Sequence, residues 1–485
     1  MAPVIKRASA AKRKSIHTRL ISEAGERQLL VMELFAGVGG FHVGFDSVKG
    51  VDDDKTPFKV IWANQWEPGK TQQHAFKVYK KHFPNAVRHP YANVDIAKYA
   101  KALNHTDPTK RVNLPKHDLL CGGFPCQDYS VAKPRNNAHG IHGKKGVLWW
   151  NIHDILKAAR VKPRYVVLEN VDRLLKSPIK RRGRDFAIML ASLNMLGYIV
   201  EWRVIDASQY GYPQRRKRVF ILGYKPRTII GLRFDSVPQV SSNLTERGLL
   251  ARAFPPSRID NIFSGELFGK NDKDEAEVLH KITVKFNRGN EVSPFHNAGI
   301  AYRGRYWTAR IHPRKPSSMK ALGDVLQSAR EVPQEFYISQ KKIPRWRKVK
   351  GAKRIEKKSR ISGIKYLYAE GAIAFPDATT NPARTIVTSE GGKTASRMKH
   401  IIKRGKRYRR LTPVELERLN GFPDNHTAQI PETRRAFLMG NALIVGCVAR
   451  IGTAIAETEG WHTRIVESNK VKKKKMRRSK NQRKP

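Results

Sequence analysis

The fold is decided by the stretch Leu34-Phe35-Ala36-Gly37-Val38-Gly39-Gly40-Phe41, which ends an apolar run at residues 29–34. The run predicts a buried strand, and the glycines let the backbone turn tightly and approach a ligand closely. A helix that begins there leaves its first N–H groups free. Because the third glycine of G-x-G-x-x-G is missing, the turn favours an adenosyl group without pyrophosphate. A tight strand–helix turn that binds no ligand is the alternative.

Short apolar runs alternate with helical patterns over residues 29–224. This alternation predicts an α/β catalytic domain with a doubly wound, mostly parallel sheet covered by helices on both faces. Over residues 225–430 the periodicity weakens, which predicts a second, smaller and irregular domain. Residues 431–465 are expected to hold a helix that completes the first domain. The expected strands are 29–34, 58–63, 118–121, 165–169, 199–205 and 219–223, and the expected helices are 71–82, 147–160, 184–196, 412–420 and 441–457.

Composition limits the class of protein. The chain has 485 residues, of which 40% are hydrophobic, which is enough for packed cores in about two to three domains. Three cysteines in this length exclude a disulfide-stapled scaffold. The apolar run from Ala442 is interrupted by Arg450, so we expect no membrane span. The first residues lack the apolar core of a secretory signal.

Charge points to the partner. Lys and Arg total 94 against 41 Asp and Glu, so the net charge is +53. A basic tail at 1–28 holds six Lys or Arg in its first 20 residues, another at 466–485 holds ten from residue 470, and eleven lie between 341 and 360. A field of this size attracts polyanions, and nucleic acid is the leading candidate. For the tails, solvated ends, phosphate contacts and a nuclear address remain alternatives, with a transit peptide a weaker one.

Polar residues follow the second and third expected strands. An acid after the second strand commonly holds ribose hydroxyls, so Gln65 or Glu67 is expected at a ribose. Trp66 is expected to stack on adenine, unless it is only a half-buried residue at a strand end. Asp95, which precedes Ile96, is expected either to accept a hydrogen bond from an adenine amino group or to cap a helix.

A candidate nucleophile follows the fourth expected strand. Two glycines and Pro125 predict a rigid, exposed turn before Cys126, at the sheet edge where such folds build their sites. The basic surroundings favour a thiolate. Cys121 and Cys447 are expected in the core, and no zinc or other metal site is expected. The polar loop at 127–146 is a candidate lid.

Polar residues also end the fifth strand and precede the last one. Glu169 is expected at the same edge as Cys126, as a catalytic acid or as a structural residue. Alternation would direct Arg216 and Arg218 to one side, where they suit a phosphate or a polar base edge. A solvated run of charge is the alternative.

These blocks together resemble the cytosine-C5 DNA methyltransferases, in the style of bacterial restriction–modification systems. The matching blocks occur in the family's order and cover nearly all of the chain outside the tails. They are residues 35–40, Gly123-Phe124-Pro125-Cys126-Gln127, Glu169-Asn170-Val171, residues 214–218, residues 410–415 with 421–424, and Gly440-Asn441-Ala442.

The resemblance implies S-adenosylmethionine as methyl donor and a cytosine in DNA as acceptor. Cys126 would add to C6 of a flipped-out cytosine, Glu169 would protonate N3, Arg218 would hold the O2 edge and Arg216 the nearby backbone. The cofactor residues would be Phe35, Gly37, Gly39, Gly40, Gln65, Trp66, Glu67, Asp95, Ile96, Pro125, Leu148, Asn441 and Ala442, and the DNA-binding residues Gln127, Gln214, Arg215 and Thr385.

Three residues depart from the family pattern. Gln65 stands where the family has its ribose-binding Glu, so Glu67 is a candidate to compensate. Ile386 follows Thr385 where the family has Leu, and Ala442 stands where Ser is frequent.

The expected partners are double-stranded DNA and a cognate restriction endonuclease for the same site, with the protein itself a monomer. We expect it inside the cell with DNA, in a bacterium or in a nuclear or viral setting. A tRNA cytosine-C5 methyltransferase and an inactive basic DNA-binding protein are the alternatives. The length of the region 225–400 favours a DNA target reader, and Cys126, Glu169, Arg216 and Arg218 argue against an inactive protein.

Overall fold

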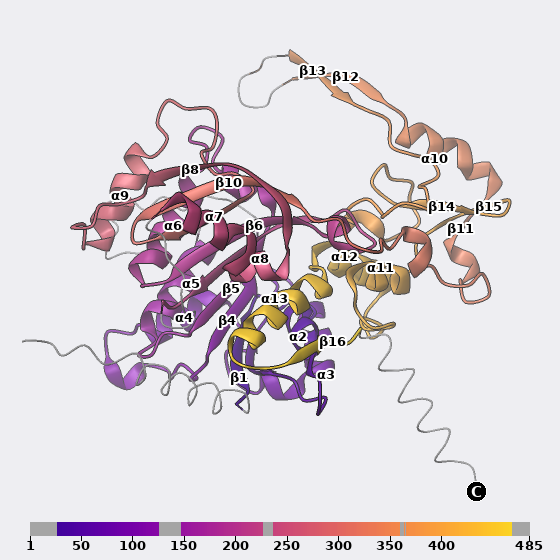
Figure 1. Cartoon of the computed structure of the whole chain (residues 1–485). Helices are drawn as coiled ribbons and strands as arrows, with labels where there is room; N and C mark the ends of the chain where they lie inside the picture. Colours follow the sequence, from indigo (N-terminus) through magenta and orange to yellow (C-terminus); the bar gives the residue numbers. More distant parts are fainter. Residues whose placement is uncertain (1–26, 126–146, 227–235, 359–362, 364, 468–485) are drawn as a thin grey trace, which may run out of the picture.

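The computed structural model describes residues 27–125, 147–226, 236–358, 363 and 365–467. Cys126 and Gln127 therefore lie outside the described residues, as do the candidate lid and both ends of the chain. Figure 1 shows a large α/β part that holds the main sheet and a smaller part built mostly from residues beyond 320.

Nine strands of the described chain form one sheet in the order β3-β1-β4-β5-β7-β6-β9-β10-β8. The first four pair in parallel, and every later pair is antiparallel. Their bounds are β1 Leu29–Leu34, β3 Phe58–Asn64, β4 Leu119–Gly123, β5 Tyr165–Asn170, β6 Ile199–Asp206, β7 Lys217–Tyr224, β8 Pro256–Glu266, β9 Ala298–Tyr302 and β10 Arg305–Pro313.

The α/β class is confirmed, but the sheet is mixed and not mostly parallel. A parallel neighbour needs a crossover of about a dozen residues or more. Only residues 207–216 connect β6 to β7, and only 303–304 connect β9 to β10, so these strands return antiparallel. The sheet also takes β8, β9 and β10 from residues 225–430. That range is therefore not one separate unit in the structure.

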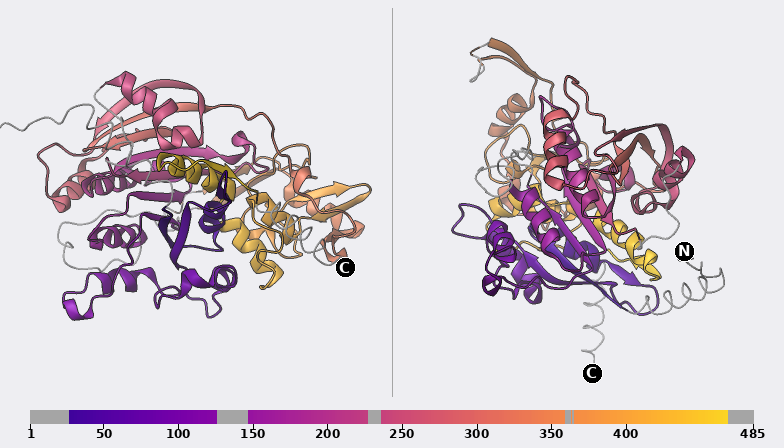
Figure 2. Two further views of the ribbon diagram at one scale, coloured as in Figure 1. Left: turned by 60° about the horizontal axis from the view of Figure 1, so that its bottom comes forward. Right: turned by 90° about the vertical axis from the view of Figure 1, so that its left-hand side faces the viewer.

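Two apolar cores lie on the two faces of the sheet, because side chains alternate along each strand. On β1, Met32 and Leu34 join one core, whereas Leu29 and Val31 join the other. Figure 2 shows the helices that cover the two faces. The first core includes residues of α4 Ile96–Leu103, α5 Val147–Ala158, α6 Arg184–Met195 and α9 Glu275–Lys285, and the second includes residues of α2 Gly40–Asp46, α7 Val237–Ser242, α8 Leu249–Ala253 and α13 Val445–Thr458.

The returning helix packs on the first domain as expected, but it is divided. α12 (Glu432–Asn441) ends before α13 begins, and the two are bent by 42°. The carbonyl oxygen of Gly440 accepts from Arg216 Nη2 at 3.0 Å, and its Cα lies against the backbone of Thr388. Within the described residues no single helix is long and apolar enough to cross a membrane; only α12 and α13 taken together reach that length and apolar character, and they are bent.

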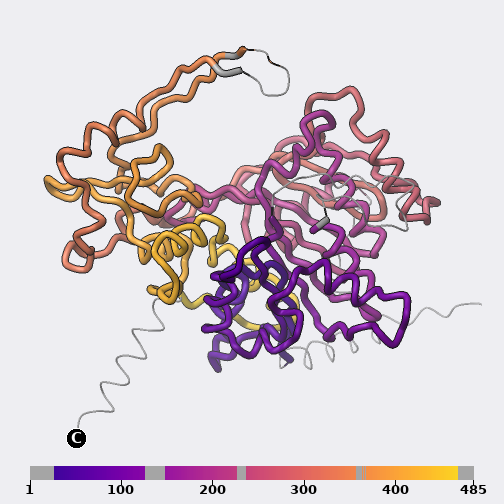
Figure 3. The backbone as a smooth tube through the Cα atoms, turned by 180° about the vertical axis from the view of Figure 1, so that it is seen from behind, coloured from indigo at the N-terminus to yellow at the C-terminus, as the bar shows by residue number. Residues whose placement is uncertain are grey.

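The smaller part contains a three-stranded sheet and an outlying two-stranded ribbon. Figure 3 shows the ribbon as an arm that extends away from the body. The sheet is built from β11 Tyr337–Ile338, β14 Ile401–Arg404 and β15 Arg407–Arg410, the ribbon from β12 Lys353–Lys358 and β13 Lys365–Glu370, and the nearby helices are α10 Ile343–Lys350 and α11 Pro413–Asn420.

Several short elements complete the fold. β2 (Val48–Gly50) pairs with β16 (Thr463–Ile465), and α3 spans His74–His82 beyond β3. The single-turn helices are η1 Pro84–Val87, η2 Pro108–Lys110, η4 Asp172–Lys176, η5 Ala207–Tyr210, η6 Asn243–Arg247, η7 Leu322–Val325, η8 Gln334–Phe336, η9 Gln340–Lys342 and η10 Thr388–Glu390.

Candidate active site

The glycine turn after β1 lies at the carboxyl edge of the parallel strands. Phe35, Gly37 and Gly39 have φ angles of 54°, 58° and 88°, in the left-handed region that favours glycine. A Cβ on Gly39 would lie 2.6 Å from the ring of Phe83, whereas one on Gly37 would meet no atom within 4 Å. Gly37 therefore borders open space, as a backbone cradle for a ligand requires.

The structure brings Gln65, and not Glu67, to this turn. Gln65 Oε1 accepts from the backbone N of Gly37 at 2.7 Å. Glu67 instead accepts from the backbone N of Ala75 at 2.9 Å, at the start of α3, and pairs with Arg434 at 2.6 Å. The carboxylate of Glu67 is therefore used by α3 and α12. Trp66 is half-buried.

The other cofactor candidates differ in their surroundings. Asp95 caps α4 by accepting from Ala97 N at 3.0 Å, so the helix-cap interpretation holds for it. The remaining candidates range from buried to exposed: Gly40 packs against Leu443, Ile96 is buried, Leu148 and Ala442 are partly buried, and Pro125 and Asn441 are exposed.

Glu169 and Arg218 form the charged centre of the site. Glu169 Oε1 lies 2.8 Å from Arg218 Nε, and their side chains are 11% and 19% exposed. Gly123 pairs with Glu169 across β4 and β5, and a Cβ on Gly123 would lie 3.2 Å from Glu169 Oε2. The glycine thus leaves room for the carboxylate beside the strand that leads to Cys126.

Asn170 ties the next residues of that strand to β5. Its Nδ2 donates to the carbonyl oxygen of Phe124 at 3.0 Å. Phe124 is itself buried in the first core. The chain is thereby held at the sheet edge immediately before Pro125 and Cys126. Asn170 belongs to one of the matching sequence blocks, but its role could not be assigned from the sequence.

Arg216 and Gln214 lie inside the protein, which differs from the expected contacts with DNA. Arg216 is 1% exposed and donates to the carbonyl oxygens of Ile386 at 3.2 Å and Gly440 at 3.0 Å. Burial, with a contribution from Arg218, lowers the pKa of Arg216 to about 9. Gln214 is 0% exposed; its Nε2 donates to Asn420 Oδ1 at 3.0 Å and its Oε1 accepts from Ile386 N at 3.1 Å. Both side chains hold the two parts of the molecule together.

Arg215 and Thr385 remain at the surface of this junction. Residues 213–216 run beside 383–386, with Arg215 N donating to the carbonyl oxygen of Ala383 at 2.8 Å. The hydroxyl of Thr385 donates to the carbonyl oxygen of Arg215. Arg215 is exposed and Thr385 is partly buried.

A buried polar network beneath the glycine turn was not predicted from the sequence. Tyr79 donates to Glu33 Oε2 at 2.7 Å, and its oxygen lies 2.8 Å from His42 Nδ1. Burial raises the pKa of Glu33 to about 8 and lowers the pKa of His42 to about 3. The signal for this network in the sequence is Glu33, an acid within the apolar run of β1. Cys121 and Cys447 are buried, as expected.

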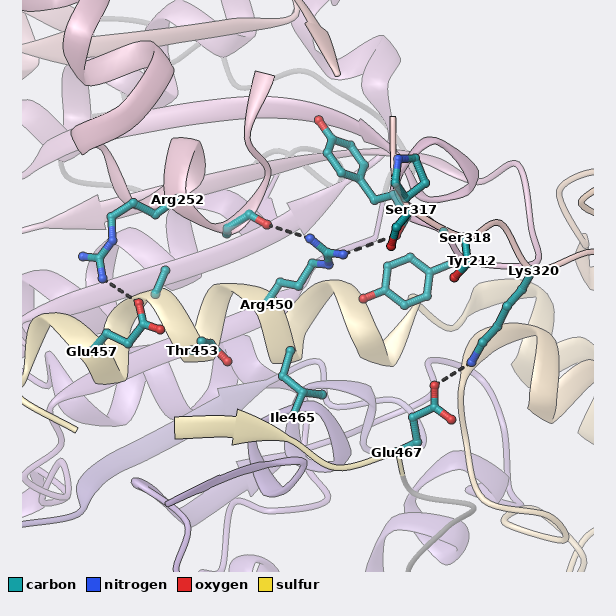
Figure 4. Close-up of a pocket in the computed structure, with 15 residues that line it drawn as sticks. Tyr212, Arg252, Ser317, Ser318, Lys320, Arg450, Thr453, Glu457, Ile465 and Glu467 are labelled. Atoms are coloured by element: carbon teal, nitrogen blue, oxygen red, sulfur yellow. Dashed lines mark hydrogen bonds and ion pairs between the residues drawn. The ribbon is translucent and has the colours of Figure 1, made fainter. Parts of the chain in front are cut away.

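A surface pocket of about 420 Å³ is lined in part by residues of α13 (Figure 4). Arg450 extends across it toward the carbonyl oxygens of Tyr210 and Ala253, each at 3.4 Å. At its rim Arg252 pairs with Glu457 and Lys320 with Glu467. Its lining residues, all described, include none of the predicted cofactor or catalytic residues, so this pocket is distinct from the candidate active site.

Comparison with known proteins identifies the family. Residues 29–457 match the family described as C-5 cytosine-specific DNA methylase. The chain is 41% identical over 434 residues to the type II methyltransferase M.Sau3AI of Staphylococcus aureus, covering 89% of this chain and 96% of the relative. It is 27% identical to the type II methyltransferase M.NlaIV of Neisseria lactamica, with 89% and 100% covered.

A solved structure shares the fold. The Dnmt2 methyltransferase of S. pombe superposes with a TM-score of 0.50 at 13% identity, covering 89% of this chain and 99% of that one. Together with the match over 29–457 and the 41% identity, the site at the edge of β1, β4 and β5 shows that this chain belongs to the C-5 cytosine-specific DNA methylase family.

Proposed function

We propose that this protein transfers a methyl group from S-adenosylmethionine to C5 of a flipped-out cytosine in a specific double-stranded DNA sequence, through a covalent bond between Cys126 and C6. As a family member the chain is a DNA cytosine-5-methyltransferase. The observation that carries the finer proposal is the Glu169–Arg218 pair at 2.8 Å, beside the strand that Asn170 holds in front of Cys126.

Each of three side chains acts on a different atom of the cytosine ring: Cys126, Glu169 and Arg218. C5 of cytosine is a poor nucleophile until a group adds to C6. Cys126 Sγ bonds to C6, Glu169 gives a proton to N3, and Arg218 donates to O2, so the ring is neutralised as electron density reaches C5. After C5 has accepted the methyl group, it loses its proton to a water-relayed base and the electron pair re-forms the double bond between C5 and C6. The thiolate of Cys126 leaves, and N3 returns its proton to Glu169.

The glycine turn fits the donor. The open space at Gly37 and the absence of a side chain there suit the close approach of an adenosyl group. S-adenosylmethionine, when bound, supplies the methyl group that C5 accepts. Gln65 is held against this turn by Gly37 N, so it is the candidate to contact the ribose. Phe35, Gly39, Asp95, Leu148 and Asn441 stay further candidates for the cofactor site.

The partners follow from the family and from the relatives' names. Relatives described as type II methyltransferases favour a target within a restriction–modification system, in which a restriction endonuclease cuts the same site. We propose that the protein acts as a monomer, because one chain contains the whole set of matching blocks. Arg215 and Thr385 are the surface candidates for DNA contact at the junction.

Bisulfite sequencing tests this function and finds the target. DNA from cells that express the gene should retain unconverted cytosines within one short recurring sequence, and DNA from cells that express Cys126→Ser should retain none there. A tRNA fraction from the same cells, treated identically, is the control substrate. Fully converted DNA, or protection in tRNA instead, would contradict the proposal.

A further inference from the structure

The connection between α11 and α12, residues 421–431, reaches from the smaller part to the glycine turn. In this connection, His426 Nε2 lies 2.7 Å from the carbonyl oxygen of Val38, which stands 388 residues earlier in the chain. Val38 is the middle residue of the turn, between Gly37 and Gly39. Figures 2 and 3 show the yellow segments beside the indigo start of the chain. The turn thus has a hydrogen-bonding partner from the far end of the sequence.

The contact is a hydrogen bond that His426 donates. A carbonyl oxygen can only accept, so Nε2 of His426 carries the proton. By the same reasoning His82, the last residue of α3, donates from its Nε2 to the carbonyl oxygen of His426 at 2.7 Å. The two imidazole rings are stacked with 4.1 Å between their centroids and 8° between their planes, and His426 is 2% exposed. His426 therefore has little freedom to turn away from Val38.

The side chain of Val38 is also covered by the smaller part. It is buried, and it belongs to an apolar cluster that includes Leu416 and Leu419 of α11 and Phe422 from the connection that follows. The ring of Phe422 lies 4.8 Å from that of His426, centroid to centroid. The turn is therefore packed against the smaller part as well as hydrogen-bonded to it.

One peptide group of the turn, between Val38 and Gly39, is held at both ends. The N–H of Gly39 donates to the carbonyl oxygen of Ala36 at 2.8 Å, and the carbonyl of Val38 accepts from His426. Gly39 has a φ of 88°, but glycine adopts φ angles of either sign at little cost. Without a partner for its carbonyl, this peptide group could rotate and reshape the wall of the open space beside Gly37. The hydrogen bond from His426 stabilises one orientation.

We propose that His426 is a positioning residue for the methyl donor: from the smaller part, it fixes the Val38–Gly39 peptide group so that the turn is ready to receive an adenosyl group beside Gly37. The inference rests on the proposed function, because it places S-adenosylmethionine at this turn. A turn that is ordered before binding loses less conformational freedom on binding, so its affinity is higher. Loss of the hydrogen bond should therefore raise both the Kd and the KM for S-adenosylmethionine and leave kcat on the target duplex nearly unchanged.

Three substitutions of His426 test the hydrogen bond. His426→Phe removes the N–H group and keeps a ring that can stack on His82. It should raise the Kd for S-adenosylmethionine roughly three- to tenfold in isothermal titration calorimetry of the full-length protein, as the loss of one hydrogen bond predicts. His426→Gln can place an amide N–H where Nε2 lies, so it should recover most of the affinity. His426→Asn ends one methylene short of that position and should bind as weakly as His426→Phe. The Gln and Asn pair decides the question if the Phe variant does not fold.

His117→Phe is the matched control. His117 is 7% exposed, and its Nδ1 donates to the carbonyl oxygen of Pro115 at 2.7 Å. It lies just before β4, at the end of that strand opposite Cys126. The control removes the same kind of hydrogen bond from a buried imidazole, and it should bind S-adenosylmethionine like the wild type.

The outcomes separate this inference from the proposed function. An unchanged Kd in His426→Phe, Gln and Asn variants that bind equally weakly, or equal weakening in His117→Phe would overturn the role of His426. A kcat that falls while the KM for S-adenosylmethionine stays unchanged would also overturn it. In each of these cases a wild type that binds S-adenosylmethionine and methylates its target leaves the proposed function intact. A wild type that binds no S-adenosylmethionine would overturn both.

Discussion

At the scale of single residues, the site depends on which side chains the fold leaves available. Glu169 and Arg218 pair with each other at the end of β5. The side chains of Arg216 and Gln214 instead make hydrogen bonds between the two parts of the molecule. Adjacent positions in one basic run therefore have different roles. Spacing along the chain predicts which side of a strand a residue occupies, but not what covers that side.

Glu169→Gln should lower single-turnover methyl transfer by about 10²- to 10⁴-fold, the usual contribution of a positioned acid. The amide keeps the size of the side chain but has no acidic proton that it can transfer to N3. Rapid-quench measurement with labelled donor gives the rate. Glu457→Gln is the matched control, because it removes a carboxylate of α13 that pairs with Arg252 of α8, away from the site. Equal rates for both variants would contradict the assignment of Glu169.

Glu33 should make stability depend on pH. Its pKa is raised from the ordinary 4.5 to about 8 in the folded state. Its contribution is therefore fully present below pH 4.5 and is lost as pH rises toward 8. His42, with its pKa lowered to about 3, adds the opposite trend only below about pH 6.5. Between pH 6.5 and 8 the Tm of the wild type should fall relative to that of Glu33→Gln. Parallel curves across this range would show that Glu33 is not the titrating group.

At the scale of elements, the glycine turn joins β1 to α2 and rests on two neighbours. Gly39 lies against Phe83, and Gly44 of α2 lies against Val448 of α13, where a Cβ would be 2.5 Å from that side chain. The returning helix thus supports the turn from behind. The sequence predicted the strand and the turn from local composition, and it predicted the return of the helix from its apolar face.

Two alanine substitutions should separate support from binding in this turn. Gly39→Ala combines a φ of 88° with a clash at 2.6 Å, so it should cost about 1–3 kcal/mol of unfolding free energy. Gly37→Ala meets no clash, so its φ of 58° should cost only about 1–2 kcal/mol of unfolding free energy. Its methyl group would enter the open space beside the turn and should mainly weaken donor binding. Thermal unfolding and calorimetric titration with S-adenosylmethionine measure the two effects. A Gly37→Ala variant that binds the donor like the wild type would remove Gly37 from the cradle.

The outlines of the elements could be predicted, but their long-range partners could not. β1 has its expected bounds, and the other five expected strands begin or end within two residues of them. The antiparallel half of the sheet was missed because the short connection before β7 looks like any loop in sequence. The burial of Gln214 depends on Asn420, about two hundred residues away. Contacts over that separation leave no local pattern in one chain.

At the scale of the whole molecule, a net charge of +53 dominates the approach to DNA. The charge is spread over the body, the ribbon and both ends, so no single group accounts for it. Long-range attraction of this kind speeds association and is screened within about 10 Å at moderate salt. Specificity must come from shorter-range contacts, for which Arg215 and Thr385 at the junction are the proposed residues.

Removal of residues 470–485 should weaken DNA binding at low salt and have little effect at high salt. The segment carries ten Lys or Arg and no acid, and such charges act through counterion release. Fluorescence anisotropy at a series of salt concentrations measures the slope. A full-length variant with those ten residues changed to Gln should match the truncation. An unchanged affinity and slope would exclude phosphate contact by this segment.

The covalent step at Cys126 is the central claim, and trapping tests it most directly. A duplex that carries 5-fluorocytosine at the target position cannot lose a proton from C5, so the enzyme should remain bonded to C6 once the methyl group has been transferred. With S-adenosylmethionine present, we predict a complex that survives denaturing electrophoresis and a peptide adduct on Cys126 by mass spectrometry, both absent in Cys126→Ser. A wild-type enzyme that methylates ordinary target DNA yet forms no adduct, or forms one at another residue, would contradict the account.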